Sequence, residues 1–299
     1  MMRIVLFLAT NFGVLILVSI VMSLLGVDAY LAEGGINYGG MLLMCALFGF
    51  GGSMISLFLS KWMAKRSMRV QLIDQPRTPD ERWLYDTTED LARAAGIKMP
   101  EVGIFPSAQP NAFATGWNKN DALVAVSQGL FQRFSREEVR AVMAHEIGHV
   151  ANGDMVTLTL IQGVVNTFVL FFSRIIGYFV DRVVFKNESG HGIGFFITTM
   201  AAQLVLGFLA SAVVAWFSRF REFRADEAGA TLASKAGMIS ALERLKSETQ
   251  QIAAAGVEND VPDNLQAFGI SGMKSRMAAI FATHPPLDVR IQHLEQRAG

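Results

Sequence analysis

Four long apolar stretches divide the sequence, and they limit what the chain can fold into more than any other feature. They cover residues 4–25, 41–59, 155–180 and 193–217. About 20 apolar residues are enough to cross the hydrocarbon core of a bilayer as a helix. Hydrophobic residues make up 52% of the chain and charged residues only 17%, and the apolar excess is concentrated in these stretches. The sequence therefore predicts a mainly α-helical membrane protein with four hydrophobic segments.

The first stretch, residues 4–25, has two interpretations. Val27-Asp28-Ala29 would serve as the cleavage site of a secretory signal peptide. However, the apolar run is longer than the core of a typical signal peptide, and Arg3 is the only basic residue before it. We therefore favour an uncleaved anchor, which forms an N-terminal transmembrane hairpin with the second stretch over residues 1–70.

The charges that flank this hairpin predict its orientation. The connector over residues 26–40 contains Asp28 and Glu33 but no Lys or Arg. The second stretch is followed by a basic cluster, namely Lys61, Lys65, Arg66 and Arg69. Positively charged flanks stay on the cytoplasmic side of a membrane. The N-terminus and the region after residue 61 are therefore predicted to be cytoplasmic.

The first polar region, residues 71–154, has the pattern of an α+β domain. Thr78-Pro79 begins an amphipathic helix that Gly96 ends, and three short β-like runs follow at residues 102–105, 112–115 and 123–127. Ser135 and Glu138 then form a capping box for a helix that stops at Asn152-Gly153. We expect a small sheet followed by this helix.

The second polar region, residues 218–299, is mainly helical in pattern. Residues 222–246 are helical in pattern, and the helical pattern returns over residues 273–297, where Pro285-Pro286 breaks it. Residues 250–271 contain Gly, Pro and Asn and are expected to form a loop. The second hydrophobic pair, residues 155–217, separates the two polar regions.

Inside the helix that begins near Ser135, residues 145–149 read His-Glu-Ile-Gly-His. Residues four apart lie on the same face of a helix. His145 and His149 can therefore present two imidazoles to one metal ion, with Glu146 within reach of a metal-bound water. This is the arrangement of a zinc metalloprotease. Two histidines on a helix surface would be the alternative, so the rest of the chain has to decide.

A catalytic zinc ion usually has three protein ligands and one water molecule. Glu222 is the strongest candidate for the third ligand, because Asp226 lies four residues further on the same helix face. One carboxylate can bind the metal while the other accepts a hydrogen bond from the second N–H of a ligand imidazole. The alternative is that both carboxylates are solvated partners of neighbouring arginines.

The remaining ligand types are weaker candidates. His191 lies in a polar loop between glycines and His293 in the last helix, and both are predicted to be solvated. Cys45 lies in the second apolar stretch and is the single cysteine of the chain, so no disulfide within the chain is possible. The net charge is zero, which gives no indication of nucleic-acid binding.

Several motifs in order resemble the HtpX family, bacterial membrane-bound zinc metalloproteases related to the CAAX prenyl proteases. The motifs are Asn111-Ala112-Phe113-Ala114-Thr115-Gly116, His145-Glu146-Ile147-Gly148-His149 with Asn152-Gly153-Asp154, Glu222-Phe223-Arg224-Ala225-Asp226, and Thr283-His284-Pro285-Pro286-Leu287-Asp288-Val289-Arg290-Ile291. The likeness extends essentially from end to end and includes the N-terminal hairpin. Several spaced motifs make it far more specific than the His-Glu-Ile-Gly-His segment alone.

The resemblance implies a role for each site residue. His145, His149 and Glu222 would hold one zinc ion per chain, and Asp226 would contact a ligand instead of the ion. Glu146 would be the general base. His284 would stabilise the oxyanion, although a histidine before two prolines can also serve only to order the turn.

The resemblance also implies a fold and a substrate class. The two polar regions would form one cytoplasmic α+β domain of the zincin type at the bacterial inner membrane. An edge strand over residues 111–115, comprising Asn111, Ala112, Phe113, Ala114 and Thr115, would bind an extended substrate by main-chain hydrogen bonds. The expected substrates are misfolded or damaged membrane proteins, in quality control and stress response, and self-cleavage is expected as well.

Topology supplies an independent condition. His149 and Glu222 must lie on the same side of the membrane, so an even number of spans separates them. We favour two spans over a hairpin that dips into the membrane or packs on the catalytic domain, although Arg174 and the basic residues of the loop after residue 180 are unusual for a translocated segment. Two other functions stay open from the sequence, a transporter whose pathway Arg174 marks and an inactive scaffold that binds unfolded segments.

Overall fold

The computed structural model describes residues 37–187, 192–254 and 282–296, with Ile20, Ser23, Leu24 and Gly26 besides. The chain divides into two compact units, Met1–Ile55 with Thr159–Val213, and Ser56–Leu158 with Val214–Gly299. Nearly all of the first apolar stretch lies outside the described residues, so the anchor stays a prediction. The predicted loop over residues 250–271 is wrong at its start, because the helix Lys235–Ala254 includes residues 250–254. The remainder of that loop, residues 255–271, and His191 lie outside the described residues.

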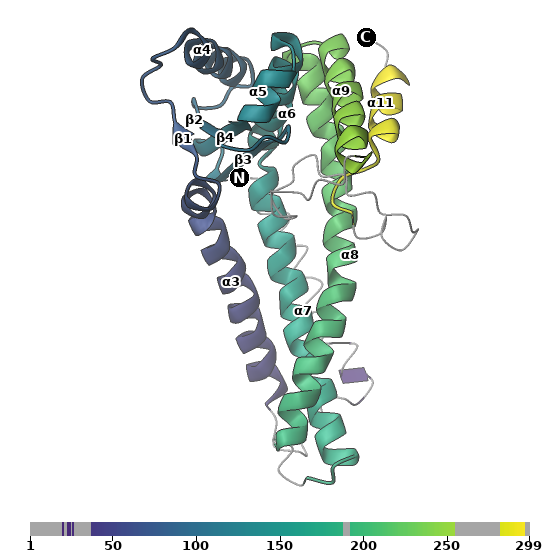
Figure 1. The fold of residues 1–299 in the computed structure, drawn as a ribbon. Helices are drawn as coiled ribbons and strands as arrows, with labels where there is room; N and C mark the ends of the chain where they lie inside the picture. The colour runs from purple at the N-terminus through teal and green to yellow at the C-terminus, as the bar shows by residue number, and fades with distance from the viewer. Residues whose placement is uncertain are drawn as a thin grey trace. The chain divides into compact units, whose positions relative to one another are not determined.

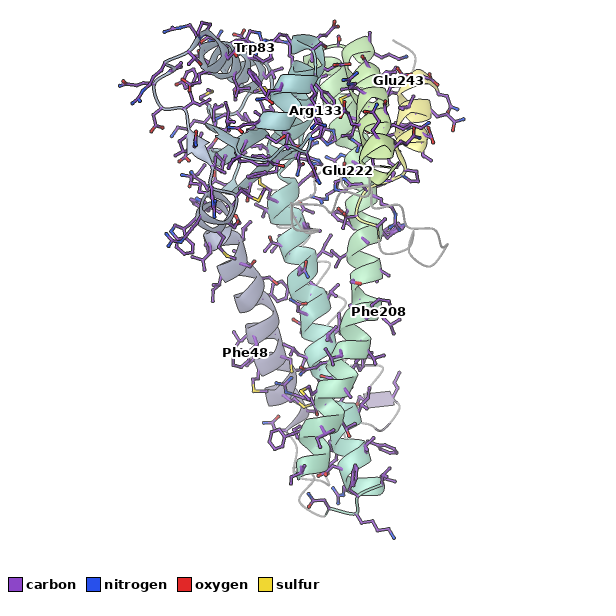
Figure 2. The ribbon with its side chains drawn as sticks, in the orientation of Figure 1. Phe48, Trp83, Arg133, Phe208, Glu222 and Glu243 are labelled. Carbon is purple, nitrogen blue, oxygen red and sulfur yellow. The ribbon has the colours of Figure 1, made fainter. Side chains whose placement is uncertain are left out.

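Three helices account for the other apolar stretches: α3 (Tyr38–Ser67), α7 (Asp154–Val183) and α8 (Ile193–Leu232) (Figure 1). Among the described residues, these three are long and apolar enough to cross a membrane. Many of their apolar side chains are turned outward, as Phe48 (66% exposed) and Phe208 (56% exposed) illustrate (Figure 2). The prediction of a mainly α-helical membrane protein is confirmed.

In the first unit, small residues bring α3 and α7 close together. A Cβ atom on Gly49 would lie 2.5 Å from the hydroxyl oxygen of Thr167, closer than real Cβ contacts allow. The side-chain amide of Asn166 donates a hydrogen bond to the Ser53 hydroxyl at 3.4 Å. Close packing around small residues and hydrogen bonds between side chains are typical of helix contacts in membranes.

The second unit contains a four-stranded mixed sheet in the order β1-β2-β4-β3. The strands are β1 (Gln71–Leu72), β2 (Glu101–Phe105), β3 (Ala112–Asn118) and β4 (Asp121–Ser127). The β2–β4 pair is parallel and the two outer pairs are antiparallel. The three predicted strands are confirmed, and β1 is an addition that two exposed residues could not signal.

Helix caps in the second unit follow the sequence signals. The α4 helix (Pro79–Ala94) begins at a capping box that Thr78 forms with Glu81. The α6 helix (Arg136–Asn152) begins at the predicted Ser135 capping box and ends at Gly153, whose φ of 68° is left-handed. Between them, the short α5 helix (Gln128–Arg133) is capped by the hydroxyl of Ser127.

The core of the second unit lies between the sheet and the helices α6, α9 (Lys235–Ala254) and α11 (Leu287–Gln296). Residues 222–246 are helical as predicted, apart from one break after Leu232. The α8 helix ends at Leu232, and α9 starts afresh because the Ser234 hydroxyl accepts a hydrogen bond from the amide of Gly237 at 2.9 Å. The apolar helix α8 therefore continues without a break through Glu222 and Asp226.

Candidate metal centre

The α6 helix presents His145 and His149 on one face, one turn apart. Their rings are 4.8 Å apart between centroids and nearly perpendicular, at 89°. His145 and Glu146 are almost completely buried, and the His149 side chain is 14% exposed. Because burying a polar group costs free energy unless it is bound, three such groups in a core require partners.

Glu222 on α8 supplies the partner that the two imidazoles share (Figure 2). Its Oε2 lies 3.5 Å from Nε2 of His145, and its Oε1 lies 3.3 Å from Nε2 of His149. Two ligand atoms bound at about 2.0–2.1 Å to a tetrahedral ion are about 3.3–3.5 Å apart. Donor atoms of all three residues lie within 4.8 Å of one another. The structure thus brings together the three residues expected to be ligands, in an arrangement that can hold a metal ion.

Two glycines let α6 and α8 approach closely enough for this. A Cβ atom on Gly148 would lie 2.6 Å from the Cβ of Ala228. A Cβ atom on Gly229 would lie 2.8 Å from the sulfur of Met238 and 3.4 Å from the backbone nitrogen of His145. Any larger residue at position 148 would push the two helices apart, and Glu222 would move away from the histidines with them.

The other nitrogen of each imidazole faces a buried carboxylate. Nδ1 of His145 lies 2.9 Å from Asp226, as the sequence analysis expected for this residue. Nδ1 of His149 lies 2.7 Å from Asp154, which had no expected role. Carboxylates in these positions fix the ring orientation and leave Nε2 as the metal-binding atom. Both imidazoles therefore turn Nε2 toward Glu222.

Asp154 is the first residue of α7, directly after the stop at Gly153. The backbone carbonyl of Asp154 accepts a hydrogen bond from the guanidinium of Arg221 at 3.2 Å, and its side chain is buried. The available signal was an acidic residue at the entry to an apolar stretch, five positions after His149. Such a residue is also a common helix start, so the sequence alone did not distinguish the two roles.

Arg290 is a second functional candidate that sequence reasoning missed. It is fully buried on α11 and donates two hydrogen bonds to Asp226, at 2.8 and 2.6 Å. Its Nη1 lies 3.5 Å from Oε2 of Glu222. Leu287, Arg290 and Leu294 form the buried face of α11, so an arginine within an apolar helix stripe was the signal.

The three remaining histidines differ in position. Nδ1 of His284 lies 2.9 Å from Oε2 of Glu222, and its side chain is 15% exposed. His293 instead pairs with Glu227 at 3.1 Å and its side chain is 41% exposed, which agrees with the prediction that it is solvated. His191 lies outside the residues that the structure describes. Of the two described histidines outside the cluster, His284 is therefore the one beside it.

The cluster carries strong local electrostatic effects. Burial opposes protonation of His149, but its hydrogen bonds to Asp154 and Glu222 win and raise the pKa of this imidazole to about 10. Burial likewise opposes protonation of His145, while contacts with Asp226 and Glu222 raise its pKa. Without a metal ion, positive charge is thus favoured at the position between the imidazoles and Glu222.

Glu146 has a buried carboxylate whose Oε1 accepts no hydrogen bond from any group that the structure describes. Buried polar atoms are normally bonded, so an exception requires an explanation. An acceptor beside two imidazoles and the carboxylate of Glu222 is suited to a bound water molecule. The donor set and this acceptor together fit a catalytic metal site.

The expected substrate strand lies at an edge of the sheet, since β3 is the last strand in the order. Its outer side is not paired with another described strand. Asn111 is anchored at the start of β3, where its backbone nitrogen donates to the Ser127 hydroxyl at 2.9 Å and its carbonyl accepts from the Ser127 amide at 2.8 Å. The strand is therefore held firmly from its inner side.

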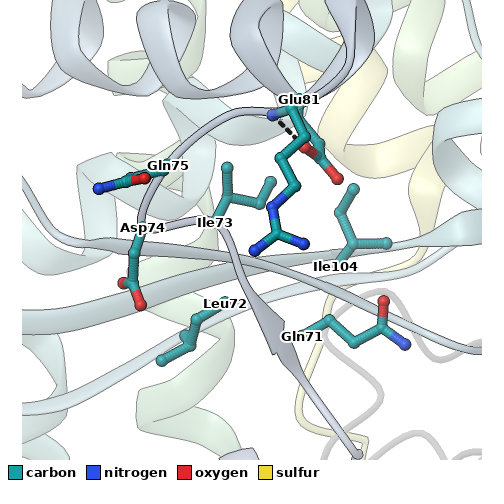
Figure 3. Close-up of a pocket in the computed structure, with 8 residues that line it drawn as sticks. Gln71, Leu72, Ile73, Asp74, Gln75, Glu81 and Ile104 are labelled. Carbon is teal, nitrogen blue, oxygen red and sulfur yellow. Dashed lines mark hydrogen bonds between the residues drawn. The ribbon is translucent and has the colours of Figure 1, made fainter.

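The opposite edge of the sheet has a different feature, a hollow of about 520 Å³ beside β1 (Figure 3). Its lining includes Gln71, Ile73 and Ile104, and Glu81 accepts a hydrogen bond from the backbone of Arg77 at its rim. It contains no histidine, and no residue predicted for the metal centre lines it. The hollow is thus separate from the metal centre.

Comparisons with known proteins agree with this geometry. The model of peptidase family M48 matches residues 79–298. The protein named Protease HtpX from Stutzerimonas stutzeri (strain A1501) is 64% identical over 298 residues, which cover 99% of this chain and 100% of the relative. Protease HtpX from Hahella chejuensis (strain KCTC 2396) is 63% identical over 295 residues, with coverages of 98% and 99%.

Among solved structures, the crystal structure of S. mikatae Ste24p has a TM-score of 0.61 at 16% sequence identity, covering 96% of this chain and 67% of that chain. At this identity the likeness concerns the fold, and it confirms the fold class expected from the sequence. The resemblance noted in the sequence is confirmed as well. The chain belongs to peptidase family M48, a family of metallopeptidases.

Proposed function

We propose that the protein is a zinc-dependent endopeptidase that hydrolyses misfolded or damaged membrane proteins at the bacterial inner membrane. The observation that carries this proposal is the buried cluster of His145, His149 and Glu222 with the carboxylate of Glu146 beside it. Two histidines and one glutamate are a donor set of catalytic zinc sites. Membership of a metallopeptidase family sets aside the transporter interpretation.

The residues around the cluster divide the chemistry between them. A bound zinc ion supplies Lewis acidity, which polarises a carbonyl and makes water a stronger acid. Glu146 accepts the proton of the attacking water as a C–O bond forms at the scissile carbonyl carbon. The same carboxyl group then donates that proton to the leaving nitrogen as the C–N bond breaks. Its unbonded Oε1 is the acceptor that this step needs.

We assign His284 to the oxyanion that develops on the carbonyl oxygen. Its Nδ1 lies 2.9 Å from Oε2 of Glu222, and Nε2 donates to the oxyanion when the ring carries a proton on both nitrogens. Removing one such donor typically costs about 100- to 1000-fold in kcat. His284→Ala is therefore expected to lower kcat by about this factor while zinc remains bound. Loss of zinc from His284→Ala would instead indicate a role as a ligand.

Substrates would bind as an extended strand along the outer edge of β3, over residues 111–115. Main-chain hydrogen bonds give affinity without demanding a particular sequence. This tolerance supports unfolded polypeptide as the substrate class. It also makes self-cleavage of unfolded copies an expected side reaction, which incubation with and without a chelator would detect as fragments.

We place the catalytic domain on the cytoplasmic side. The support is the basic cluster that follows the apolar part of α3, including Lys65, Arg66 and Arg69. The α7 and α8 helices are each long and apolar enough to span, and two spans return Glu222 to the side of His149. A reporter enzyme that functions only in the periplasm can be fused at Gln75. Activity of this reporter would contradict the cytoplasmic orientation.

The central experiment compares wild type with Glu146→Gln in detergent. Both are expected to bind about one zinc ion per chain, but only the wild type should cleave an unfolded substrate. Glu243→Gln, an exposed change on α9, is the matched control and should cleave normally (Figure 2). Undiminished cleavage by Glu146→Gln would refute the mechanism. If the wild type binds zinc but cleaves no substrate either, the result would favour an inactive scaffold that binds unfolded segments.

A further inference from the structure

The apolar length of α3 determines where this helix meets the bilayer surface. From Tyr38 to Ser60 the sequence has no Asp, Glu, Lys, Arg or His, and Lys61 is the first charged residue. The hydrocarbon core, about 30 Å thick, takes up about 20 helical residues. The uncharged segment is just long enough for one crossing. One bilayer surface must therefore lie close to Lys61.

The side chains of α3 around this level are suited to such a surface. In the second unit, Phe58 and Trp62 lie one turn apart and are 54% and 62% exposed. One turn further, Arg66 is exposed on the same face. A tryptophan followed by a basic residue at the end of an apolar helix is typical of the membrane–water interface.

The β3–β4 hairpin contacts α3 at this level. The ring of Trp117, near the tip, lies 5.7 Å from the ring of Phe58 between centroids, and Trp117 remains 44% exposed. Lys61 forms ion pairs with Asp121 on the same hairpin and, at 2.9 Å, with Glu101 on β2. The hairpin is thus attached to α3 beside its exposed apolar face.

A β-bulge directs Trp117 to this position. Gly116 pairs with Ala122 and Asn118 pairs with Asp121, so Trp117 is an extra residue without a partner on β4. Gly116 has a φ of 149°, and a Cβ atom there would lie 2.3 Å from the backbone oxygen of Asp121, so the bulge depends on glycine. Bulges often serve to re-aim one side chain.

We propose that the tip of the β3–β4 hairpin is seated in the lipid headgroup region of the bilayer. Trp117 lies there beside Phe58 and Trp62, and the exposed Lys119 of the turn meets anionic lipid headgroups. The exposed apolar face around Phe58 continues along the same helix that spans the bilayer, which is why lipid and not a protein partner is the occupant.

The position of the hairpin tip in the headgroup region has a consequence for substrates. This consequence rests on the proposed function. A strand rises about 3.3 Å per residue, so Thr115 and Phe113 lie within about 7–13 Å of Trp117 along β3. A peptide added to the edge of β3 would begin at the bilayer surface. The preferred substrates are therefore polypeptide segments that have just left the membrane.

Lipid contact is measured with single-tryptophan variants in nanodiscs. One variant keeps Trp117, with Trp62, Trp83 and Trp216 changed to Phe, and the control keeps only Trp83, which packs against Phe131 on α5. Lipids with a nitroxide high on the acyl chain are expected to quench Trp117 and leave Trp83 unchanged. A nitroxide near the bilayer centre should quench Trp117 less. Equal quenching of Trp117 and Trp83 would overturn the proposal.

A second measurement covers the case in which the triple substitution impairs folding. In a Cys45→Ala background, a spin label at Lys119→Cys should collide with oxygen and be shielded from a water-soluble nickel complex. The exposed Asp86→Cys on α4 is the matched control and should be open to nickel. Equal nickel accessibility at positions 119 and 86 would refute the proposal that the hairpin tip lies in the headgroup region. Neither readout involves cleavage, so an inactive enzyme with quenched Trp117 would refute only the proposed function.

Discussion

Arg290 donates two hydrogen bonds to Asp226, at 2.8 and 2.6 Å, and both side chains are fully buried although 64 residues separate them. Asp226 in turn faces Nδ1 of His145 at 2.9 Å. Arg290 on α11 therefore influences Nε2 of His145 through the Asp226 carboxylate and the imidazole ring. The position of His145 depends on a residue that touches neither metal nor substrate.

Arg290→Ala is expected to destabilise the protein by about 3–5 kcal/mol, because Asp226 becomes a buried charge without its partner. The free energy of unfolding is measured in detergent by thermal or denaturant titration. Arg93→Ala, whose side chain is 70% exposed, is the control and should cost less than about 1 kcal/mol. Similar losses in the two variants would show that the Asp226 contact contributes little.

Asp154→Asn is expected to weaken zinc binding by about 10- to 100-fold, because a carboxylate that orients a ligand imidazole typically contributes this much. The folded protein should persist, since Asn keeps the size and an acceptor oxygen. Competition with a chromogenic chelator measures the affinity. Asp90→Asn on the exposed face of α4 is the control, and an affinity as high as in that variant would contradict the role of Asp154.

Gly148→Ala is expected to lower zinc affinity without changing any ligand. Its Cβ would lie 2.6 Å from the Cβ of Ala228, so α6 and α8 must separate, at a cost of about 1–3 kcal/mol. Gly207→Ala introduces the same methyl group on α8, where nothing lies within 4 Å. That control should bind zinc normally, whereas full zinc binding by Gly148→Ala would show that the helices have room to spare.

Zinc binding is expected to release protons. In the metal-free protein the pKa of His149 is raised to about 10, so this imidazole is protonated at neutral pH, whereas a ligand imidazole must be neutral. Zinc affinity should therefore rise with pH, by about tenfold per unit for one released proton, and level off only above about pH 10. Calorimetry in buffers of different ionisation enthalpy measures the protons released, and an affinity independent of pH would contradict this protonation.

Much of the metal centre was predictable because its spacing is local. His145, Glu146 and His149 occupy one helix, and helix geometry alone brings the two imidazoles together. Glu222 and Asp226 share another helix in the same way. The pairing of these two helices was not readable from periodicity, and only the choice of acidic residues after the apolar stretches indicated it.

The contributions of Asp154 and Arg290 were not predictable for a physical reason. Arg290 acts on Asp226, 64 residues away, and Asp154 acts on His149 across the break between two helices. A single charged residue at a helix start or in an apolar stripe has several common explanations. The sheet order could not be predicted either. The β1 strand has only two residues, and the parallel partners β2 and β4 are separated in the sequence by β3. Long-range pairing leaves no local pattern.

One unbroken helix, α8, carries both an apolar stretch and Glu222. Translation therefore delivers the histidines of α6 first, then two hydrophobic helices, and only afterwards the carboxylate that joins them. Arg290 and His284 are synthesised later still. A ribosome-bound chain that has not passed residue 222 has an incomplete ligand set, so proteolytic activity can begin only after α7 and α8 have been made. The order of residues along the chain thus delays the enzyme until its own membrane part exists.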